Sequence, residues 1–339
     1  MRRVLSASPA ILHNLPMVDV YFYEAFQEEA DELRSLLPDG ISADCTSATI
    51  QEAGHRAPPA KLISIRTQSQ IPLAWAPQLD AILTRSTGYD HLRAYAAATG
   101  APLALGYLPL YCHRAVAEQA MLLWLALLRR LPLQMQQFRT FHRDGITGRE
   151  SLAKTLVVVG VGNIGHEVCR LGAALDMRVL GVDVEPIRGD VAYVDVDVAL
   201  PQADVLVCAM DLNPSNRGYF DRARWQQVKR GAVFVNVSRG ELSPTTALLA
   251  ALEAGQLSGV GLDVFDHEAV LATSLRTGAT TDDAEVAATL ALSQRDDCIL
   301  TPHNAFNTAE AVFRKSEHSV EQLVAWQKEA AFLWPVPLD

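Results

Sequence analysis

Short apolar runs, each closed by glycine, aspartate or another polar residue, recur along this chain of 339 residues. From Thr155 onward six such runs follow one another, and helical patterns separate several of them. They read "TLVVVGVGNIG", "RVLGVDVEP", "ADVLVCAM", "GAVFVNVSRG", "SGVGLDVFD" and "CILTPHNAF". Alternation of this kind predicts βαβ units, in which helices cover both faces of a parallel sheet.

The first third of the chain shows the same alternation of apolar runs and polar residues, but less regularly. Residues 18–26 begin like a strand, and residues 28–37 repeat apolar positions at helical spacing. Three more apolar runs follow, at 61–69, 79–90 and 101–111, and the first two lead into a polar loop that contains arginine. These runs are typical of parallel strands that carry polar groups at their carboxyl ends.

Between the two regions lies the strongest helical pattern of the chain, at residues 114–131. It is apolar on most sides, which predicts burial, and Pro132 is expected to end it because proline does not continue a helix. Residues 134–151 are polar and irregular, as in an arm or linker. A polar segment rich in Thr and Asp, residues 269–297, later interrupts the α/β pattern.

Composition mainly excludes classes of partner. Hydrophobic residues make up 49% of the chain and charged residues 20%, which allows a sizeable core. The net charge of −10, without a basic tail, argues against nucleic acid and anionic membranes as partners. The longest purely apolar run, Ala120–Leu128, has nine residues, whereas a span of a bilayer needs about 20.

Two further features bear on location and on the start of the fold. The five cysteines are scattered and show no metal-type spacing, which is typical of reduced thiols in a cytoplasmic protein. No His, Cys or carboxylate spacing suggests a metal site either. Residues 1–16 mix polar and apolar positions, so we expect a disordered extension there and a fold that starts near Met17.

The run that starts at Thr155 leads into a G-x-G-x-x-G pattern, followed by a helical pattern. In such a loop the first glycine permits a tight turn, the second lets the backbone approach a pyrophosphate, and the third allows helix and strand to pack closely. The phosphates then meet the amino-terminal end of the helix. From the residues alone, a glycine-rich turn without a dinucleotide and a methyltransferase-type loop remain alternatives. The predicted cofactor loop comprises Gly160, Gly162, Asn163, Ile164 and Gly165.

The next apolar run ends in Asp183, which lies 18 residues beyond Gly165. A carboxylate at this point can accept hydrogen bonds from both ribose hydroxyls and would repel a 2′-phosphate. The position therefore favours NAD over NADP, although the nearby Arg188 leaves NADP open.

Three ionisable residues follow strands downstream of the glycine loop: Arg239, Glu268 and His303. Each alone could be an ordinary solvated or strand-end residue, but ligands bind beyond the carboxyl ends of strands in such sheets. Hydride transfer to a ketone leaves an alkoxide that needs a proton, and histidine titrates near neutral pH. A carboxylate beside it would orient the ring, and an arginine fork would bind a substrate carboxylate. Together they suit the reduction of a 2-keto acid.

The segments "GVGNIG", "VNVSRGEL", "LDVFDHE" and "LTPHNAF" occur in the order and at the separations of the NAD-dependent D-2-hydroxyacid dehydrogenases. The chain resembles this family over residues 61–325, and its motifs are most similar to those of the D-lactate dehydrogenase branch. The resemblance implies reversible hydride transfer between NADH and a small 2-keto acid. It also implies that Arg239 and Glu268 are catalytic, with His303 as the acid/base.

On the substrate side, "ISIRTQS" and "TRSTGYD" resemble the family's substrate-carboxylate loops, and "LPLYCHRAVAEQA" resembles its interdomain crossing. Asp263 matches the position that holds the nicotinamide carboxamide. The substrate-binding residues that the resemblance implies are Arg66, Thr87, Gly88 and Tyr111.

The resemblance further implies two Rossmann-like doubly wound parallel-sheet domains with the active site in the cleft between them. The substrate domain would be discontinuous, residues 17–112 plus 306–339, around an NAD-binding domain at 113–305. A homodimer is expected, because the helix at 114–131 and the arm that follows it cross to the partner subunit in the family.

The chain departs from the family at Ala269, where proline is usual, and in the adenine-side loop "MDLNPSNRG". The interval of 35 residues from Glu268 to His303 is also longer than in many members. This interval favours pyruvate as the substrate. Glyoxylate, hydroxypyruvate and larger keto acids remain alternatives, as does a phosphite dehydrogenase on the same scaffold. A different class, an NAD-sensing corepressor-like binding protein, shares the fold and the residues.

Overall fold

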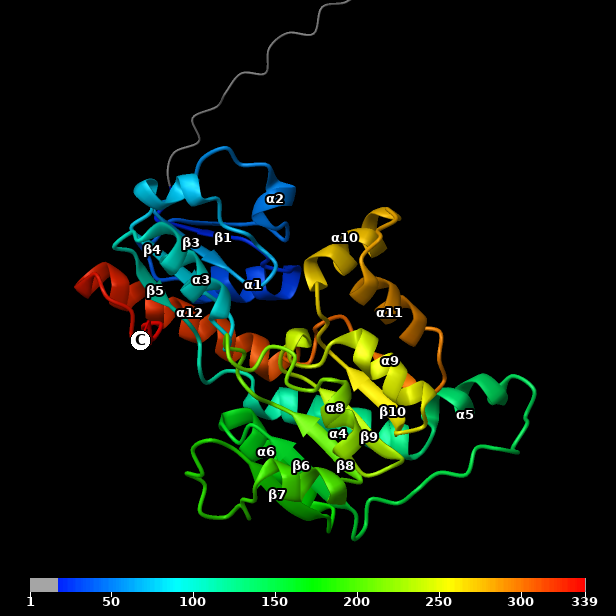
Figure 1. Cartoon of the computed structure of the whole chain (residues 1–339). Coiled ribbons are helices and arrows are strands. Elements are labelled where there is room, and N and C mark those ends of the chain that lie inside the picture. The colour runs from blue at the N-terminus through cyan, green and yellow to red at the C-terminus, as the bar shows by residue number, and fades with distance from the viewer. Residues whose placement is uncertain (1–17, 339) are drawn as a thin grey trace, which may run out of the picture. The chain divides into compact units, whose positions relative to one another are not determined.

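The computed structural model describes residues 18–338, and the chain divides into two compact units (Figure 1). Unit 1 extends to Leu108 and resumes at Ser316, and unit 2 comprises residues 109–315. The boundaries expected from the sequence were 112/113 and 305/306. The extension expected at residues 1–16 lies outside the described residues.

Unit 1 is built on a five-stranded parallel sheet with the strand order β2-β1-β3-β4-β5. Its strands are β1 (Val20–Phe22), β2 (Ala43–Cys45), β3 (Leu62–Ile65), β4 (Ala81–Thr84) and β5 (Ala104–Gly106). Its helices are α1 (Gln27–Leu36), α2 (Ile50–Ala53), α3 (Asp90–Thr99) and the 3₁₀ helix η1 (Leu73–Gln78). The apolar runs predicted four of these strands. The edge strand β2 was missed because it has only three residues, and the exposed Asp44 lies between two partly buried ones.

Arg85, which the sequence placed in a polar loop after β4, is fully buried in unit 1. Its Nε atom lies 2.7 Å from Oε1 of Glu29, and Nη2 donates to the carbonyl oxygen of Tyr23 at 2.7 Å. A buried charge needs such partners, because desolvation is costly without them. Arg85 therefore supports the interior of unit 1.

The end of the chain returns to unit 1 through α12 (Ala309–Glu329). Gln322 is fully buried, and its side-chain amide donates to the carbonyl of Tyr107 and accepts from the backbone N–H of Leu333. Pro335 forms an antiparallel bridge with Gly106. These contacts make the carboxyl-terminal segment part of unit 1.

Unit 2 is built on a six-stranded parallel sheet with the order β11-β10-β9-β8-β6-β7. Its strands are β6 (Thr155–Val159), β7 (Arg178–Val182), β8 (Val205–Cys208), β9 (Ala232–Asn236), β10 (Leu257–Leu262) and β11 (Cys298–Leu300). Its main helices are α4 (His113–Leu128), α5 (Leu131–Phe138), α6 (Asn163–Ala174), α9 (Thr245–Glu253), α10 (Glu268–Thr277) and α11 (Ala284–Leu292). The shorter ones are α7 (Val196–Ala199), α8 (Arg222–Gln227), η2 (Leu200–Gln202) and η3 (Gly240–Leu242). Both units thus have the predicted α/β architecture.

Strand β10 shows why this sheet needs helices on both faces. An added Cβ at Gly261 would meet Cβ of Leu123 in α4 at 3.0 Å, so one face of the strand packs closely against α4. The alternate residue Leu262 belongs to the apolar cluster that includes Leu248 and Leu252 of α9. Since successive strand residues point to opposite faces, α4 and α9 cover different faces of the sheet.

The prediction that Pro132 ends the helix at 114–131 is wrong. Helix α4 ends at Leu128, Arg130 adopts a left-handed conformation (φ 54°), and Pro132 lies in the first turn of α5. Proline is accepted there because the first N–H groups of a helix have no partner within it. The first part of residues 134–151, which were predicted to be irregular, therefore belongs to helix α5. Within residues 18–338, no helix is both long and apolar enough to cross a membrane.

Candidate active site

The glycine loop joins β6 to α6 in unit 2, and its geometry explains why glycine occupies three of its positions. Gly160 has a left-handed φ of 89°, and a Cβ there would lie 2.6 Å from the backbone of Met210. A Cβ at Gly165 would lie 1.9 Å from the carbonyl oxygen of Gly160. A Cβ at Gly162 would meet no atom within 4 Å, so this exposed backbone is open to a ligand at the start of α6. The loop and the helix end fit a dinucleotide pyrophosphate.

Asp183 follows β7 and is tied to the glycine loop. Its Oδ2 atom accepts from the backbone N–H of Val161 at 2.5 Å, and Oδ1 accepts from that of Glu185 at 3.0 Å. Arg188 turns to the loop as well, because its Nη2 atom donates to Oδ1 of Asn163 at 2.8 Å. The carboxylate therefore lies beside the glycine loop and the arginine against the first residue of α6, while the contact of Asp183 with a ribose stays a prediction.

His303 and Glu268 come together although 35 residues separate them. Nδ1 of His303 lies 2.8 Å from Oε1 and 2.9 Å from Oε2 of Glu268, and both side chains are about one-fifth exposed. With Nδ1 on the carboxylate, Nε2 is the ring atom that can exchange a proton with a substrate. This arrangement suits general acid/base chemistry.

The backbone of His303 is left-handed, with a φ of 51°, which the sequence did not indicate. Asp263, only 1% exposed, braces the loop around it. Its Oδ1 atom accepts from the hydroxyl of Thr301 at 2.6 Å and the N–H of Asn304 at 2.9 Å, while Oδ2 accepts from the N–H of Ala305 at 2.8 Å. Burial raises the pKa of Asp263, and these donors oppose that effect. Such uncommon conformations persist only where the surroundings hold them.

Arg239 is half-buried at the start of η3, in a loop that follows β9. The fully buried amide of Asn236 donates to the carbonyl of Arg239 at 2.9 Å and to Oγ of Ser243 at 2.8 Å. A Cβ at Gly240 would come within 1.8 Å of the backbone of Phe265. The arginine loop therefore packs directly against the loop that leads to Glu268. Sequence reasoning missed Asn236, although an amide at the end of a buried strand is a recognisable signal.

The predicted substrate-binding residues belong to different units. Tyr111 lies in unit 2, is buried, and has its ring centroid 6.4 Å from that of Phe306. Arg66, Thr87 and Gly88 lie in unit 1. The hydroxyl of Thr87 donates to the carbonyl of Leu108 at 3.3 Å. Their contribution to substrate binding stays a prediction.

A residue that the sequence did not indicate shapes the Arg66 loop. Glu24 is buried and left-handed (φ 55°), and its carboxylate accepts from the backbone N–H groups of Arg66, Gln68 and Ser69, each at 3.1 Å. A carboxylate that binds three N–H groups fixes the loop without needing a cation. Among residues 18–338, no group of three or more His, Cys, Asp or Glu side chains could hold a metal ion.

This fold and this kind of site are typical of dinucleotide-dependent oxidoreductases, and comparison with known proteins identifies the family. The model of the family "D-isomer specific 2-hydroxyacid dehydrogenase, NAD binding domain" matches residues 121–305. The chain belongs to this family of NAD-dependent D-2-hydroxyacid dehydrogenases, and NAD is its cofactor.

Individual relatives are similar over most of their length. D-lactate dehydrogenase of Escherichia coli (strain K12) is 31% identical over 226 residues, which are 65% of this chain and 68% of that protein. Glyoxylate reductase of Thermofilum pendens is 29% identical over 74% of this chain and 72% of that protein. The crystal structure of D-lactate dehydrogenase from Aquifex aeolicus, complexed with NAD and lactic acid, aligns with a TM-score of 0.80 and 28% identity, covering 93% of this chain and 98% of that one.

Proposed function

We propose that the protein reduces pyruvate to D-lactate with NADH, reversibly, and that His303 is its acid/base. The observation that carries the chemistry is the pair of His303 and Glu268, with Nδ1 2.8 Å from the carboxylate. The choice of pyruvate is supported by the D-lactate dehydrogenases among the relatives and by the structure from Aquifex aeolicus that contains lactic acid.

In keto-acid reduction, protonated His303 donates from Nε2 to the oxygen that becomes the hydroxyl, and neutral His303 takes this proton back in the reverse direction. Glu268 orients the ring and stabilises the imidazolium. Arg239 binds the substrate carboxylate with two donors and polarises the carbonyl beside it. Bound NADH supplies the hydride; the loop from Gly160 to Gly165 would hold its pyrophosphate, Asp183 its ribose and Asp263 its carboxamide.

The test of the substrate is a panel of 2-keto acids followed by NADH absorbance, with the product assayed by D- and L-specific methods. Pyruvate should give the highest kcat/KM and D-lactate the product. A higher value with glyoxylate or hydroxypyruvate would replace pyruvate as the substrate, an alternative that the glyoxylate reductase of Thermofilum pendens supports. Turnover with phosphite would contradict the proposed reaction. Binding of NADH without turnover of any keto acid would favour the corepressor-like alternative.

The wild-type protein is expected to prefer NADH over NADPH by about 10²-fold in kcat/KM, because placing like charges together costs several kcal/mol. Asp183→Ala should reduce this preference at least about tenfold, since it removes the carboxylate that repels a 2′-phosphate. Steady-state kinetics with both cofactors at equal concentration measure it. Asp190→Ala removes an exposed carboxylate from the same segment and should keep the wild-type preference. A wild type that prefers NADPH would refute the role of Asp183.

We also propose a homodimer formed through unit 2. Helices α4 and α5 expose large apolar side chains: Leu122 is 56% exposed, Met135 66% and Phe138 75%. Leu122 and Met135 line, together with Ile299 and other residues, a hollow of 680 Å³. Apolar side chains grouped in this way mark interaction surfaces, and a second copy of the chain is the occupant we propose. A cytoplasmic location is proposed too, since the five cysteines, all within residues 18–338, form no disulfide.

Light scattering at micromolar concentration should therefore give twice the chain mass of 36.9 kDa. Phe138→Glu is expected to shift the protein towards the monomer, because it places a charge in an apolar contact. Leu73→Glu is the matched control, since Leu73 is 58% exposed in η1 of unit 1. A wild-type protein that scatters as a monomer would contradict the proposal.

A further inference from the structure

Glu268 is the first residue of α10, and the residue before it is held in an uncommon conformation. His267 has a left-handed backbone, with φ 54° and ψ 36°. Only a few per cent of residues other than glycine adopt positive φ, and they keep it where the surroundings hold them. The direction in which Glu268 leaves the chain therefore depends on what fixes His267.

Asp283 holds the side chain of His267. Nδ1 of His267 lies 2.6 Å from Oδ2 of Asp283. The other oxygen of Asp283 caps α11, because Oδ1 accepts from the backbone N–H groups of Glu285 and Val286 at 3.0 and 3.1 Å. One carboxylate thus joins the residue before Glu268 to the first turn of α11.

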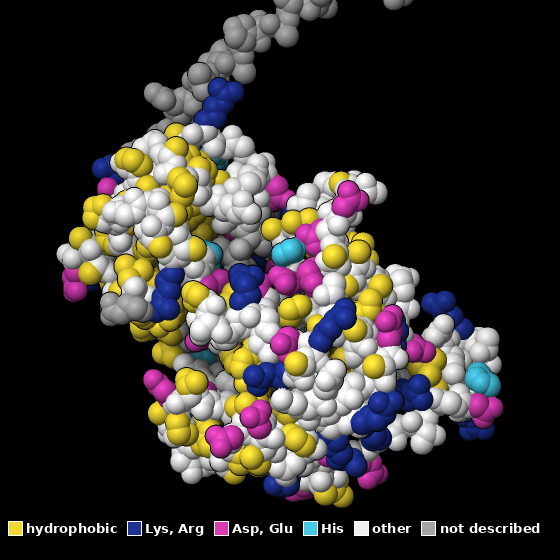
Figure 2. All heavy atoms as spheres, viewed as in Figure 1, with side chains coloured by type: hydrophobic (Ala, Val, Ile, Leu, Met, Phe, Trp, Pro, Cys, Tyr) yellow, Lys and Arg dark blue, Asp and Glu magenta, His cyan; other side chains and the backbone are white. Residues whose placement is uncertain are grey.

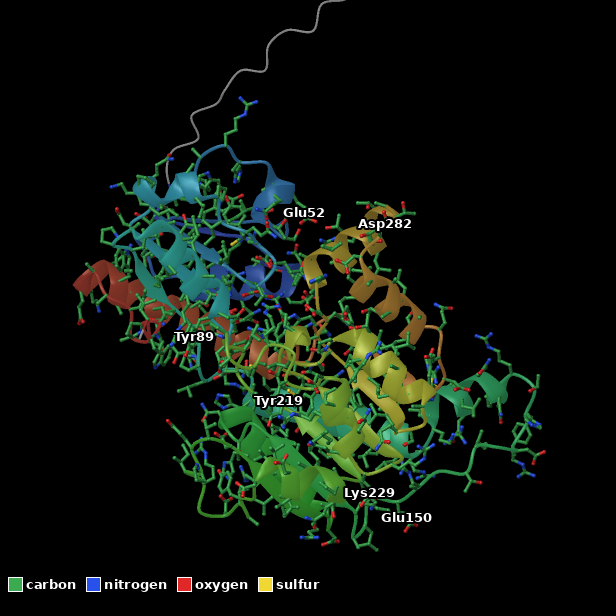
Figure 3. The ribbon with its side chains drawn as sticks, in the orientation of Figure 1. Glu52, Tyr89, Glu150, Tyr219, Lys229 and Asp282 are labelled. Carbon is green, nitrogen blue, oxygen red and sulfur yellow. The ribbon has the colours of Figure 1, made fainter. Side chains whose placement is uncertain are left out.

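Helix α11 is itself anchored to the body of unit 2. It buries an apolar face, and the carboxylate of Glu285 accepts from the N–H and the hydroxyl of Thr246 in α9, at 3.1 and 2.7 Å. Asp282, labelled in Figure 3, lies between α10 and α11 and directly precedes Asp283 in the chain. Contacts therefore run without interruption from α9 through α11 and Asp283 to His267.

We propose that His267 and Asp283 are positioning residues, which keep the carboxylate of Glu268 on Nδ1 of His303. This inference rests on the proposed roles of Glu268 and His303. Proton transfer needs the imidazole in one orientation, and a misplacement of about 1 Å can cost 10²-fold in rate. The segment 269–297, which interrupts the α/β pattern of the sequence, thereby carries the anchor for the catalytic carboxylate.

The surroundings of His267 favour its charged form. Acidic side chains gather over the start of α10 (Figure 2), and the groups that act on His267 are Asp283, Asp266 and Glu285. The hydrogen bond to Asp283 is the largest reason that the pKa of His267 is raised. Protonated His267 therefore stabilises the fold below the ordinary histidine pKa, and this contribution is lost as the pH rises through the raised value. Neutral His267 can still donate from Nδ1 to Asp283.

Two substitutions weaken or remove the hydrogen bond between His267 and Asp283 but keep the backbone conformation around it. His267→Gly removes the imidazole, and glycine adopts the left-handed conformation without strain. Asp283→Asn keeps a residue that can cap α11 but removes the charge. Each should lower kcat for keto-acid reduction about 3–10-fold, leave the KM for the keto acid unchanged, and move the upper limb of the pH–rate profile to lower pH. Glu268→Gln gives the reference for the direction of that movement.

The double variant should be no worse than either single variant, because both remove the same link. Lys229→Ala is the matched control: it removes a surface lysine of unit 2, 46% exposed, whose Nζ lies 2.7 Å from Oδ1 of the largely buried Asp204, and it should keep the wild-type profile. Loss of turnover that is equal at every pH would show a merely structural role and overturn the proposal. A raised KM with unchanged kcat would indicate a substrate contact and overturn it as well.

A spectroscopic measurement tests the link without turnover. In protein labelled with ¹⁵N-histidine, the Nδ1 proton of His303 on Glu268 should give a resonance that Glu268→Gln removes and that weakens or shifts in both variants. An unchanged resonance in His267→Gly and Asp283→Asn would refute the positioning role. Full activity of His303→Ala would instead refute the proposed function, so the two failures can be told apart.

Discussion

Replacement of His303 by alanine is expected to lower kcat for keto-acid reduction by about 10²–10⁴-fold, the usual effect of losing a positioned acid/base. The reason is geometric, because Nδ1 of His303 is held on Glu268 and Nε2 is the atom that can transfer the proton. Binding of NADH, followed by its fluorescence, should change little, since the glycine loop lies elsewhere in unit 2. Steady-state kinetics and this titration together measure the effect.

His303→Asn is the companion variant. Asparagine tolerates the left-handed backbone that His303 adopts, with φ 51°. It cannot act as the acid or base, so it should lose as much turnover as His303→Ala. If His303→Ala kept more than about a tenth of the wild-type turnover, His303 would be a strand-end residue and the proposed mechanism would fail.

The second large effect is expected at Arg239. Arg239→Ala should raise the KM for the keto acid and also lower kcat, with kcat/KM reduced about 10²–10³-fold, because the fork acts on the carboxylate and on the carbonyl beside it. Arg239→Lys keeps the charge without the planar fork and should recover only part of this loss. Kinetics with pyruvate measure both variants.

Arg178→Ala controls for the loss of an arginine from unit 2, since Arg178 is exposed and donates to the side chain of Gln202 at 2.8 Å. It should behave as wild type. A change in KM alone for Arg239→Ala would mean that the arginine only binds the substrate and does not act on the carbonyl.

The sheet of unit 2 and its glycine loop could be predicted because their signals are local. The central strands β6, β8 and β9 are almost entirely apolar runs, and the spacing of Gly160, Gly162 and Gly165 is dictated by one turn and one helix start. Asp183 could be found for the same reason, as it directly follows the next strand. The pairing of Glu268 with His303 needed the resemblance to a family, because contact across 35 residues has no local signal.

What the sequence did not predict depends on tertiary context. Pro132 reads as a helix end, yet the turn at Arg130 lets it start α5 instead. The polar segment after Glu268 contains α10 and α11, whose caps become visible only when Asp283 is seen to bind two N–H groups. The left-handed backbone of His303 depends on hydrogen bonds that the following residues donate to Asp263, which lies directly after β10.

Asp263 accepts those hydrogen bonds, and this role limits what substitutions at that position can reveal about cofactor binding. An asparagine there would turn an NH₂ group towards a donor, because the carboxylate accepts from Thr301, Asn304 and Ala305 with both of its oxygens. Any substitution would therefore disturb the loop of His303 and appear as lost catalysis, even if the cofactor still bound normally. Thr301→Val deletes one donor to Asp263 and leaves the acid in place, so its phenotype can be assigned to the hydroxyl of Thr301, which also accepts from Nε2 of Gln119 at 3.4 Å.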